Sequence, residues 1–244
     1  MITEESFIDF RCPYCQEPVS FPRETAGFVE MCPSCTESLI VPGDGSEEGL
    51  KIPLPRPTPR LVLRRLAPGD WRDLLELMAD EEFFRYQDAT PLDEDGVLRW
   101  LQSDGHVKLT TPDQPFVIGI QVQEGEKLIG YASLTFTDPQ RLQVSLNVAL
   151  NSKFHRKGYG TEAVEGLLGF CFQEIKLHRV TAATDSRNVA ACKLCEKVGF
   201  RREGEFVKNR WAQGEWTNTV YYALLAEDCE EEGQPSSQAE QSPG

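Results

Sequence analysis

Four of the eight cysteines form two short pairs near the N-terminus, Cys12 with Cys15 and Cys32 with Cys35. Two residues separate the members of each pair, so both thiolates of a pair can reach one metal ion. Sixteen residues lie between the pairs, a spacing typical of zinc bound by four sulfur atoms. We therefore predict a structural zinc ion, because four cysteine ligands leave no open position for metal catalysis. Two redox-active Cys-x-x-Cys pairs are the alternative, but neither pair stands in a thioredoxin-like strand–helix context.

The segment that holds these pairs, residues 1–42, is short and acidic. About forty residues rarely bury a stable core alone, so a metal that joins the two pairs is physically expected. Residues 1–50 carry ten acidic and two basic side chains. The segment resembles the small zinc-ribbon modules found at the N-terminus of bacterial proteins. Its charge argues against binding to nucleic acid and leaves two roles open, contact with a protein partner or a passive appendage.

A second candidate site combines glycines with positive charge in the segment FHRKGYGTEA, residues 154–163. Gly158 and Gly160 let the backbone turn so that successive N–H groups point at one anion, and the start of a helix adds to the attraction. Arg156 and Lys157 place positive charge at the same point. Such a loop is able to hold a phosphate or pyrophosphate. A tight strand-to-helix turn with solvated basic residues is the alternative, and neither the dinucleotide nor the Walker motif is matched.

Composition divides the chain of 244 residues into four parts. We expect a zinc ribbon over 1–42, a proline- and glycine-rich linker over 43–59, one large domain over 60–226 and an acidic, disordered tail over 227–244. The formal charge of −14 comes from the two ends, because residues 51–226 carry 23 acidic and 23 basic side chains. Hydrophobic residues make up 40% of the chain, which is enough for a packed core.

Strand and helix patterns alternate within residues 60–226. Residues 141–150 alternate between apolar and polar side chains, which predicts a strand with one buried face. Trp71, Leu74, Leu75 and Met78 have the spacing of one helix face. The remaining predicted strands are 60–66, 116–123, 127–136, 178–184, 200–211 and 216–225, and the remaining helices are 93–103, 160–174 and 188–198. The order predicts a mixed α/β (α+β) domain with a mostly antiparallel sheet flanked by helices.

Two motifs and the final strand together resemble a known family. HRKGYGTEA is similar to the acetyl-CoA pyrophosphate loop of the GNAT superfamily of N-acetyltransferases, and NVAACKLCEKVGF, residues 188–200, is similar to that family's later helix. The ending from Trp211 to Leu225 resembles the subfamily of ribosomal-protein N-terminal acetyltransferases. The resemblance covers about residues 60–226 and implies a GNAT fold.

The resemblance also implies which residues hold acetyl-CoA. Family members bind it in a cleft between the fourth and fifth strands, with the pyrophosphate on backbone amides of the loop. The implied loop positions are Arg156, Lys157, Gly158, Gly160 and Thr161. Leu146 and Val148 would contact the pantetheine arm through their backbones. Asn188 would contact it through its side chain, with a simple helix N-cap as the alternative.

Several positions depart from the family pattern. His155 stands where the loop motif has Gln or Arg, Ser145 where several relatives carry a general-base glutamate, and Ala191 where the ribosomal subfamily often has serine. Cys195 replaces the tyrosine that protonates the departing CoA thiolate, so it is either a substitute acid or a core residue. The general base stays unassigned, and Glu82, Tyr86, Asp138 and His178 are the candidates that the sequence offers.

The resemblance and the residues together predict an acetyl-CoA-dependent N-acetyltransferase that acts on a protein N-terminus or a small amine by direct attack. A non-catalytic acyl-CoA sensor and a zinc-ribbon protein-interaction module are the alternatives. We expect no membrane and no nucleic acid among the partners, because no apolar run is long enough to span a bilayer and the ends are acidic. Without a secretory signal in this sequence, a cytoplasmic location is expected.

Overall fold

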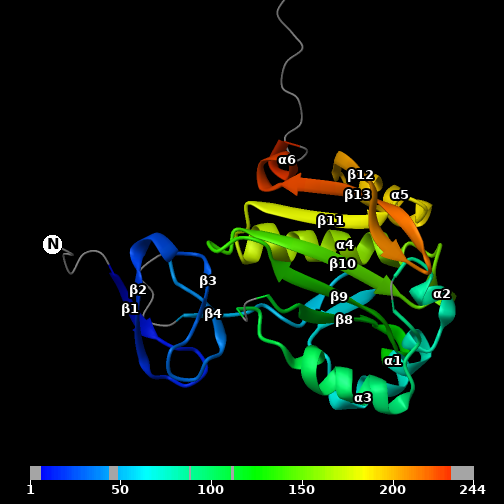
Figure 1. Ribbon diagram of the computed structural model, residues 1–244. Helices are drawn as coiled ribbons and strands as arrows, with labels where there is room; N and C mark the ends of the chain where they lie inside the picture. The colour runs from blue at the N-terminus through cyan, green and yellow to red at the C-terminus, as the bar shows by residue number, and fades with distance from the viewer. Residues whose placement is uncertain (1–6, 44–48, 88, 111–112, 232–244) are drawn as a thin grey trace, which may run out of the picture.

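The computed structural model describes residues 7–43, 49–87, 89–110 and 113–231 (Figure 1). A small lobe that carries the paired cysteines lies beside one end of a larger sheet with helices on both faces. We call the small lobe, residues 7–43 with β5 (Leu50–Lys51), the cysteine lobe. Among the described residues, no helix is long and apolar enough to cross a membrane.

Two antiparallel strand pairs build the cysteine lobe, and each turns at one Cys-x-x-Cys pair. β1 (Phe7–Arg11) pairs with β2 (Pro18–Pro22), and β3 (Val29–Met31) pairs with β4 (Ser38–Ile40). In both turns the carbonyl of the first cysteine accepts a hydrogen bond from the amide four residues later. The repeated turn brings the four thiols together above a small apolar core. That core contains Ile8, Phe10, Val19, Leu39 and Val41.

The predicted linker, residues 43–59, pairs with a sheet at two points of its described part, residues 43 and 49–59. β5 adds to β4 of the cysteine lobe, and β6 (Arg56–Pro57) adds to β7 (Leu61–Arg64) of the large sheet. The chain is extended here, as expected for a segment with four prolines between residues 50 and 59. Both ends are nevertheless held by main-chain hydrogen bonds, so the segment joins the two lobes through short strands.

The large sheet has eight strands in the order β12-β13-β11-β10-β9-β8-β7-β6. All neighbours run antiparallel except β10 and β11, which run parallel. This arrangement confirms the expected mixed and mostly antiparallel fold. The remaining bounds are β8 (Phe116–Val122), β9 (Leu128–Phe136), β10 (Gln143–Leu150), β11 (Arg179–Asp185), β12 (Arg201–Ala212) and β13 (Glu215–Leu225).

Helices cover the two faces of the sheet unequally. α4 (Tyr159–Gly169) and α5 (Val189–Lys197) pack on one face, where the main apolar cluster runs from β7 to β13. α1 (Trp71–Met78), α2 (Glu81–Phe84) and α3 (Glu94–Ser103) pack on the other face against β8 and β9. Asp93 and Asn188 cap α3 and α5 by accepting from the amides of Gly96 and Ala191. Figure 1 shows β10, β11 and β13 in front of α4 with no helix before them.

Two predicted elements differ from the structure. The helix expected over 160–174 ends as an α-helix at Gly169 and continues to Glu174 with the wider π-helical turn. The tail expected to be disordered from residue 227 begins with a short helix, α6 (Ala226–Glu231), so that expectation is wrong for 227–231. The Leu225 amide donates to the Asp228 carboxylate, a local hydrogen bond that favours this turn. Residues 232–244 lie outside the described residues.

The cysteine lobe contacts the large sheet through buried polar and apolar groups. The Ser38 hydroxyl lies 3.0 Å from the Thr110 hydroxyl and accepts from the Thr110 amide, and both residues are buried. Arg141 forms an ion pair with Glu30 at 2.7 Å. Val29 and Ile40 belong to the same apolar cluster as the sheet strands. The lobe is therefore packed into the rest of the protein and does not hang from a free linker.

Candidate functional site

The parallel strands β10 and β11 separate along their length. Their register contains only the three pairs Gln143–Arg179, Val144–Val180 and Ser145–Thr181. β10 nevertheless continues to Leu150 and β11 to Asp185, with β9 and β13 paired on their outer sides. The strands are thus joined at one end and open at the other. We call these the closed end and the open end of the β10–β11 pair.

Apolar side chains from β10 and α5 line the helix side of this opening. Leu146 is buried, and Val148, Leu194 and Cys195 are half-buried against the main apolar cluster. Asn188 stands where α5 begins, directly after the open end of β11. Its side chain makes the N-cap bond to Ala191, as the alternative prediction held. The expected positions Leu146, Val148 and Asn188 therefore lie around one opening, beside a β10 edge that β11 does not pair.

The glycine loop follows β10 at the open end. Asn151 caps a short turn by accepting from the Lys153 amide, and the His155 ring lies 2.9 Å from the Leu150 carbonyl oxygen. His155 thus ties the two sides of the loop together. Arg156 and Gly158 both adopt left-handed backbone, with φ of 59° and 85°. At Gly158 this conformation favours glycine, because a side chain there is strained.

These turns leave a row of free amides at the start of α4. The N–H groups of residues 156–161 donate to no other described residue, and the first helical bond runs from Glu162 to the Gly158 carbonyl. Arg156, Lys157 and Gly158 are exposed, while Gly160 and Thr161 are half-buried. A helix N-terminus with free N–H groups and two basic side chains attracts an anion. All five predicted loop residues belong to this surface.

Arg60, directly before β7, holds the loop in place at the start of α4. Sequence patterns did not reveal this role. Its guanidinium donates to the Glu162 carboxylate at 2.7 Å and to the Lys157 carbonyl at 3.0 Å, and it stacks on the Tyr159 ring. Burial alone would raise the pKa of Glu162. Hydrogen bonds from Thr58 and Arg60 outweigh this effect and hold that pKa below its usual value. The charged Glu162 therefore anchors residues 58–60 to the helix start.

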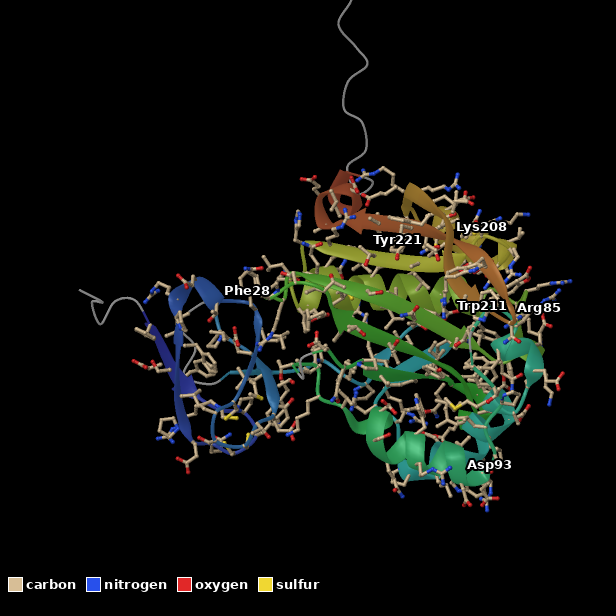
Figure 2. All side chains as sticks on the ribbon, in the orientation of Figure 1. Phe28, Arg85, Asp93, Lys208, Trp211 and Tyr221 are labelled. Carbon is tan, nitrogen blue, oxygen red and sulfur yellow. The ribbon has the colours of Figure 1, made fainter. Side chains whose placement is uncertain are left out.

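α2 and the residues after it form a wall across the open end, on the face opposite α4. The Ser152 hydroxyl donates to Asp80, the α2 N-cap residue, at 3.0 Å. Gln213, in the turn between β12 and β13, donates to the Gln87 carbonyl at 2.7 Å. The wall thus joins the end of β10 to the last hairpin. Figure 2 shows Arg85 at this wall with Trp211 of β12 nearby.

The four candidate bases separate into two groups. Glu82 and Tyr86 belong to the wall at the open end, where Glu82 pairs with Arg85 at 3.0 Å. Asp138 lies at the closed end, where its carboxylate accepts from the Leu142 and Gln143 amides, and His178 directly precedes β11 there. Phe84, between Glu82 and Tyr86 along the chain, is buried among the helices of this face.

Cys195 is a protonated thiol near the opening. Burial, with smaller effects of Cys192 and Glu196, raises its pKa to about 11. A group with such a pKa carries its proton throughout the neutral range. Glu196, the next residue, accepts a hydrogen bond from the Tyr222 hydroxyl at 3.2 Å. The sequence leaves two roles open for Cys195, a substitute acid or a core residue. Its half-buried position is compatible with both roles.

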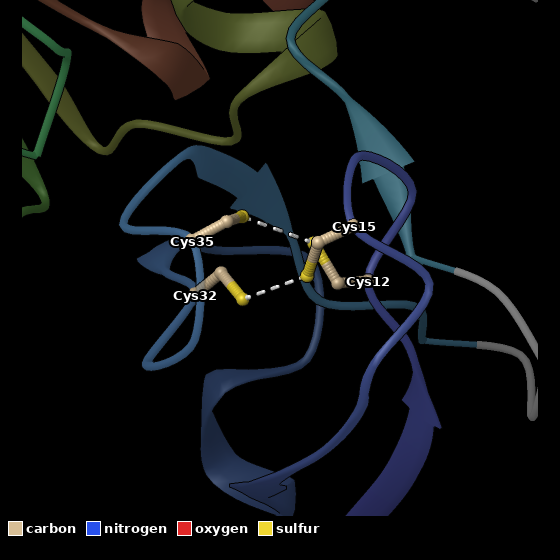
Figure 3. A group of neighbouring side chains, drawn as sticks. All are labelled: Cys12, Cys15, Cys32 and Cys35. Atoms are coloured by element: carbon tan, nitrogen blue, oxygen red, sulfur yellow. Dashed lines mark hydrogen bonds between the residues drawn. The ribbon is translucent and has the colours of Figure 1, made fainter.

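The four N-terminal cysteines converge at a separate site within the cysteine lobe (Figure 3). Their sulfur atoms all lie within 4.8 Å of one another. Cys12 Sγ is 3.7 Å from Cys35 Sγ, and Cys15 Sγ is 3.9 Å from Cys32 Sγ. Tetrahedral zinc with bonds of about 2.3 Å separates its sulfur ligands by about 3.8 Å. Two of the cysteines are buried and two half-buried, so the residues present fit a closed four-sulfur metal site.

Comparison with protein families identifies residues 60–201, more than half of the chain, as matching the model described as "Acetyltransferase (GNAT) domain". The chain is 26% identical over 171 residues to "Uncharacterized N-acetyltransferase YnaD" of Bacillus subtilis, which covers 70% of this chain and 96% of that protein. It is 29% identical over 105 residues to "Putative ribosomal N-acetyltransferase YdaF" of the same organism, covering 43% and 57%.

A solved structure gives the same result for the fold. The acetyltransferase (GNAT family) from Bacillus anthracis superposes with a TM-score of 0.64 at 26% identity, covering 70% of this chain and 98% of that chain. The family model begins at residue 60 and so does not include the cysteine lobe.

Proposed function

The chain belongs to the GNAT family of acetyltransferases, and we propose that it moves the acetyl group of acetyl-CoA to a primary amine. A protein N-terminus and a small amine are the two acceptor classes within this proposal. The observation that carries it is the open end of the β10–β11 pair, with the free amides of residues 156–161 at its mouth. An apolar slot that ends in an anion-binding helix start suits a long thioester with a pyrophosphate.

We propose that this slot holds acetyl-CoA through the backbone more than through side chains. The amides from Lys157 to Thr161 would bind the pyrophosphate, and the edge of β10 at Leu146 and Val148 would bind the amide groups of the pantetheine arm. The Asn188 amide nitrogen keeps hydrogen-bonding capacity while its oxygen caps α5. Backbone contacts of this kind do not require Gln or Arg at position 155. The His155 ring there serves to hold the loop.

The proposed reaction is attack of a neutral amine on the thioester, with Cys195 supplying a proton to the departing thiolate. A thiol with a raised pKa retains its proton until it is needed. The amine proton would leave on the face opposite α4, where Glu82 and Tyr86 stand at the open end. Ser145 and Asn147 on β10 offer no carboxylate there, so holding the two reactants together supplies much of the rate.

We also propose that the four N-terminal cysteines bind one structural zinc ion. The sulfur separations and the closed, partly buried arrangement support this assignment. The ion would hold the two turns of the cysteine lobe together and would take no part in acetyl transfer.

Calorimetric titration with acetyl-CoA tests the proposed cofactor site. Gly158→Glu places a negative side chain at a left-handed position, 3.2 Å from the Arg60 guanidinium for its first carbon, and should abolish binding. Gly125→Glu is the matched control, because Gly125 also has a positive φ and open space around it, in the turn between β8 and β9. Equal binding by both variants, or no binding by the wild type, would contradict the proposal.

A second candidate function follows from Ser145 and Cys195, which replace residues used in catalysis by relatives. The protein would then bind acyl-CoA without transferring the acyl group. Acetyl-CoA binding without release of free CoA, across a panel of amines and N-terminal peptides, would favour this candidate over the enzyme.

A further inference from the structure

Among the described residues, helices cover only part of the sheet face that packs against α1, α2 and α3. The apolar cluster of α1, α2 and α3 reaches the sheet only at β8, β9 and the residues next to them, and Tyr131 of β9 is its last member on that side. Tyr131 pairs with Ala149 of β10, so the odd-numbered residues of β10 point to the same face. Through Ser145–Thr181 and Ala183–Tyr221, the same face continues over β11 and β13. We call this uncovered region the open face.

An aromatic pair lies on the open face. Phe206 of β12 pairs with Thr219, and Tyr221 lies two residues farther along β13 on the same side. The two rings pack edge to face with centroids 4.8 Å apart, yet 54% of Phe206 and 40% of Tyr221 are exposed. Tyr222 points to the opposite face, where it is buried against α5. Figure 2 places Tyr221 on β13 within the uncovered half of the sheet.

Neutral and small residues connect this pair to the opening between β10 and β11. They are Ser145, Asn147, Thr181 and Ala183, while Thr219 and Ala223 on the same side of β13 are buried. Charged side chains of β11 stand only at the two ends, where Arg179 pairs with Glu203 and Arg187 pairs with Asp185. Asp185 is buried and held by Arg187, so the described residues of this floor present no free carboxylate for a polycationic amine. The surface suits a neutral, extended ligand with an apolar side chain.

The distance between neighbouring strands sets how far the aromatic pair lies from the reacting amine. Tyr221 lies one strand beyond Ala183, and the opening lies directly on the other side of β11. Two strand spacings amount to about 10 Å, which three residues of an extended peptide cover. A peptide whose N-terminal amine enters the opening therefore brings its second or third side chain to Phe206 and Tyr221.

We propose that Phe206 and Tyr221 form a subsite for an apolar side chain at the second or third residue of a polypeptide acceptor. This inference rests on the proposed acetyltransferase function and narrows its acceptor to protein N-termini. The continuity of the open face with the opening supports a peptide that runs across the sheet. A second copy of the chain that pairs along β12 is disfavoured, because this edge strand carries charged side chains of both signs and two register shifts.

Competing peptide acceptors test the subsite. We would compare kcat/KM for a peptide with leucine at positions 2 and 3 and for its counterpart with serine at both, sharing the same first residue. The wild type should prefer the leucine peptide by about tenfold or more. The double variant Phe206→Ser, Tyr221→Thr should reduce this preference to about twofold. Val207→Ser is the matched control, since Val207 is 71% exposed on the same strand and lies outside the pair.

Three outcomes would overturn the inference. These are no preference in the wild type, a preference that the double variant keeps, and acetyl transfer to small amines alone. Acetyl-CoA titration of each variant separates these results from failure of the proposed function, because the aromatic pair is not expected to affect that binding. Sedimentation of the same variants tests whether the aromatic pair is instead a contact between two copies of the chain. A dimer that the double variant dissociates, with peptide preference unchanged, would assign the pair to self-association.

Discussion

The two ends of the β10–β11 pair differ in how their polar groups are used. At the closed end the strands hydrogen-bond to each other, the Thr181 hydroxyl donates to the Val144 carbonyl, and Asp138 accepts from the amides that begin β10. The cysteine lobe packs here, because Arg141 lies two residues before β10 and contacts Glu30. At the open end the β10 edge is unpaired by β11, and the amides of residues 156–161 donate to no other described residue.

Under the proposed function, this difference lets one pair of strands serve both stability and binding. Satisfied groups at the closed end hold the strands in place, while unsatisfied groups at the open end keep their hydrogen bonds for a ligand. Changes at the closed end should therefore lower stability and leave ligand affinity intact. Changes to the unpaired groups of the open end should do the reverse, whereas the satisfied side chains that hold its loop still contribute to stability.

Removal of the proposed zinc site should give the largest effect and tests the closed end. Cys12→Ser takes away one of four sulfur ligands, and structural zinc contributes about 10–16 kcal/mol to folding in small zinc modules. We expect zinc content to fall from one ion per chain, and amide protection to be lost over residues 7–43 in hydrogen exchange. Acetyl-CoA affinity should remain within experimental error. A chain that holds no zinc in the wild type, or keeps its protection in the variant, would contradict this expectation.

The proposed proton donor at the open end should give the next largest effect. Cys195→Ala should lower kcat by about a hundredfold, the lower range for a general acid, with little change in KM for acetyl-CoA. Because the pKa of Cys195 is about 11, the wild-type kcat should show no decline from this group between pH 7 and 9. Cys192→Ala, one turn earlier on α5, serves as the control. Equal kcat in both variants would assign Cys195 to the core.

A smaller effect is expected at the contact between the cysteine lobe and the sheet. Ser38→Ala leaves the buried Thr110 hydroxyl and amide without their partner, which costs about 1–3 kcal/mol. Chemical denaturation measures the loss, and acetyl-CoA affinity should not change. Ser20→Ala, at an exposed position of β2, is the matched control and should be neutral. A loss of affinity in the Ser38 variant would show that the two ends are coupled.

The smallest effect concerns a carboxylate that fixes the loop at the open end. Glu76 of α1 accepts from Lys153 at 2.7 Å, from Lys127 at 2.9 Å and from Asn151 at 3.1 Å. The Lys153 bond, followed by the Lys127 bond, lowers its pKa to about 2. Glu76→Gln should reduce stability at pH 7 by about 1 kcal/mol, because these groups are partly exposed.

The difference in stability between the wild type and the Glu76→Gln variant should change with pH in one direction. The folded pKa lies below the ordinary value of 4.5, so the stabilisation is complete above about pH 4.5 and disappears as the pH falls toward 2. Denaturation of both proteins over this range should therefore give converging curves. Glu81→Gln, at an exposed position of α2, is the matched control and should leave the stability at pH 7 unchanged. A constant difference down to pH 2 would show that charge at Glu76 is unimportant.

Sequence patterns predicted most elements of the large domain and the residues that form each site locally. The four cysteines and the segment 156–161 depend on short spacings, which the chain displays directly. The contacts that position these sites join residues far apart in the chain, such as Arg60 with Glu162 and Glu76 with Lys153. Periodicity describes one element at a time and does not say which surfaces meet. For the same reason Ser38 with Thr110, and Gln213 with the carbonyls after α2, were not foreseen.

The strand β6 has a further consequence for the solution behaviour of the protein. It is the last strand of the sheet beyond β7, it has only two residues, and one of them is Pro57, which has no amide hydrogen to offer a neighbour. Prolines 55 and 59 flank it on either side. An edge with so few donors is a poor template for strands of other chains, so the segment that connects the two lobes also protects the sheet against aggregation.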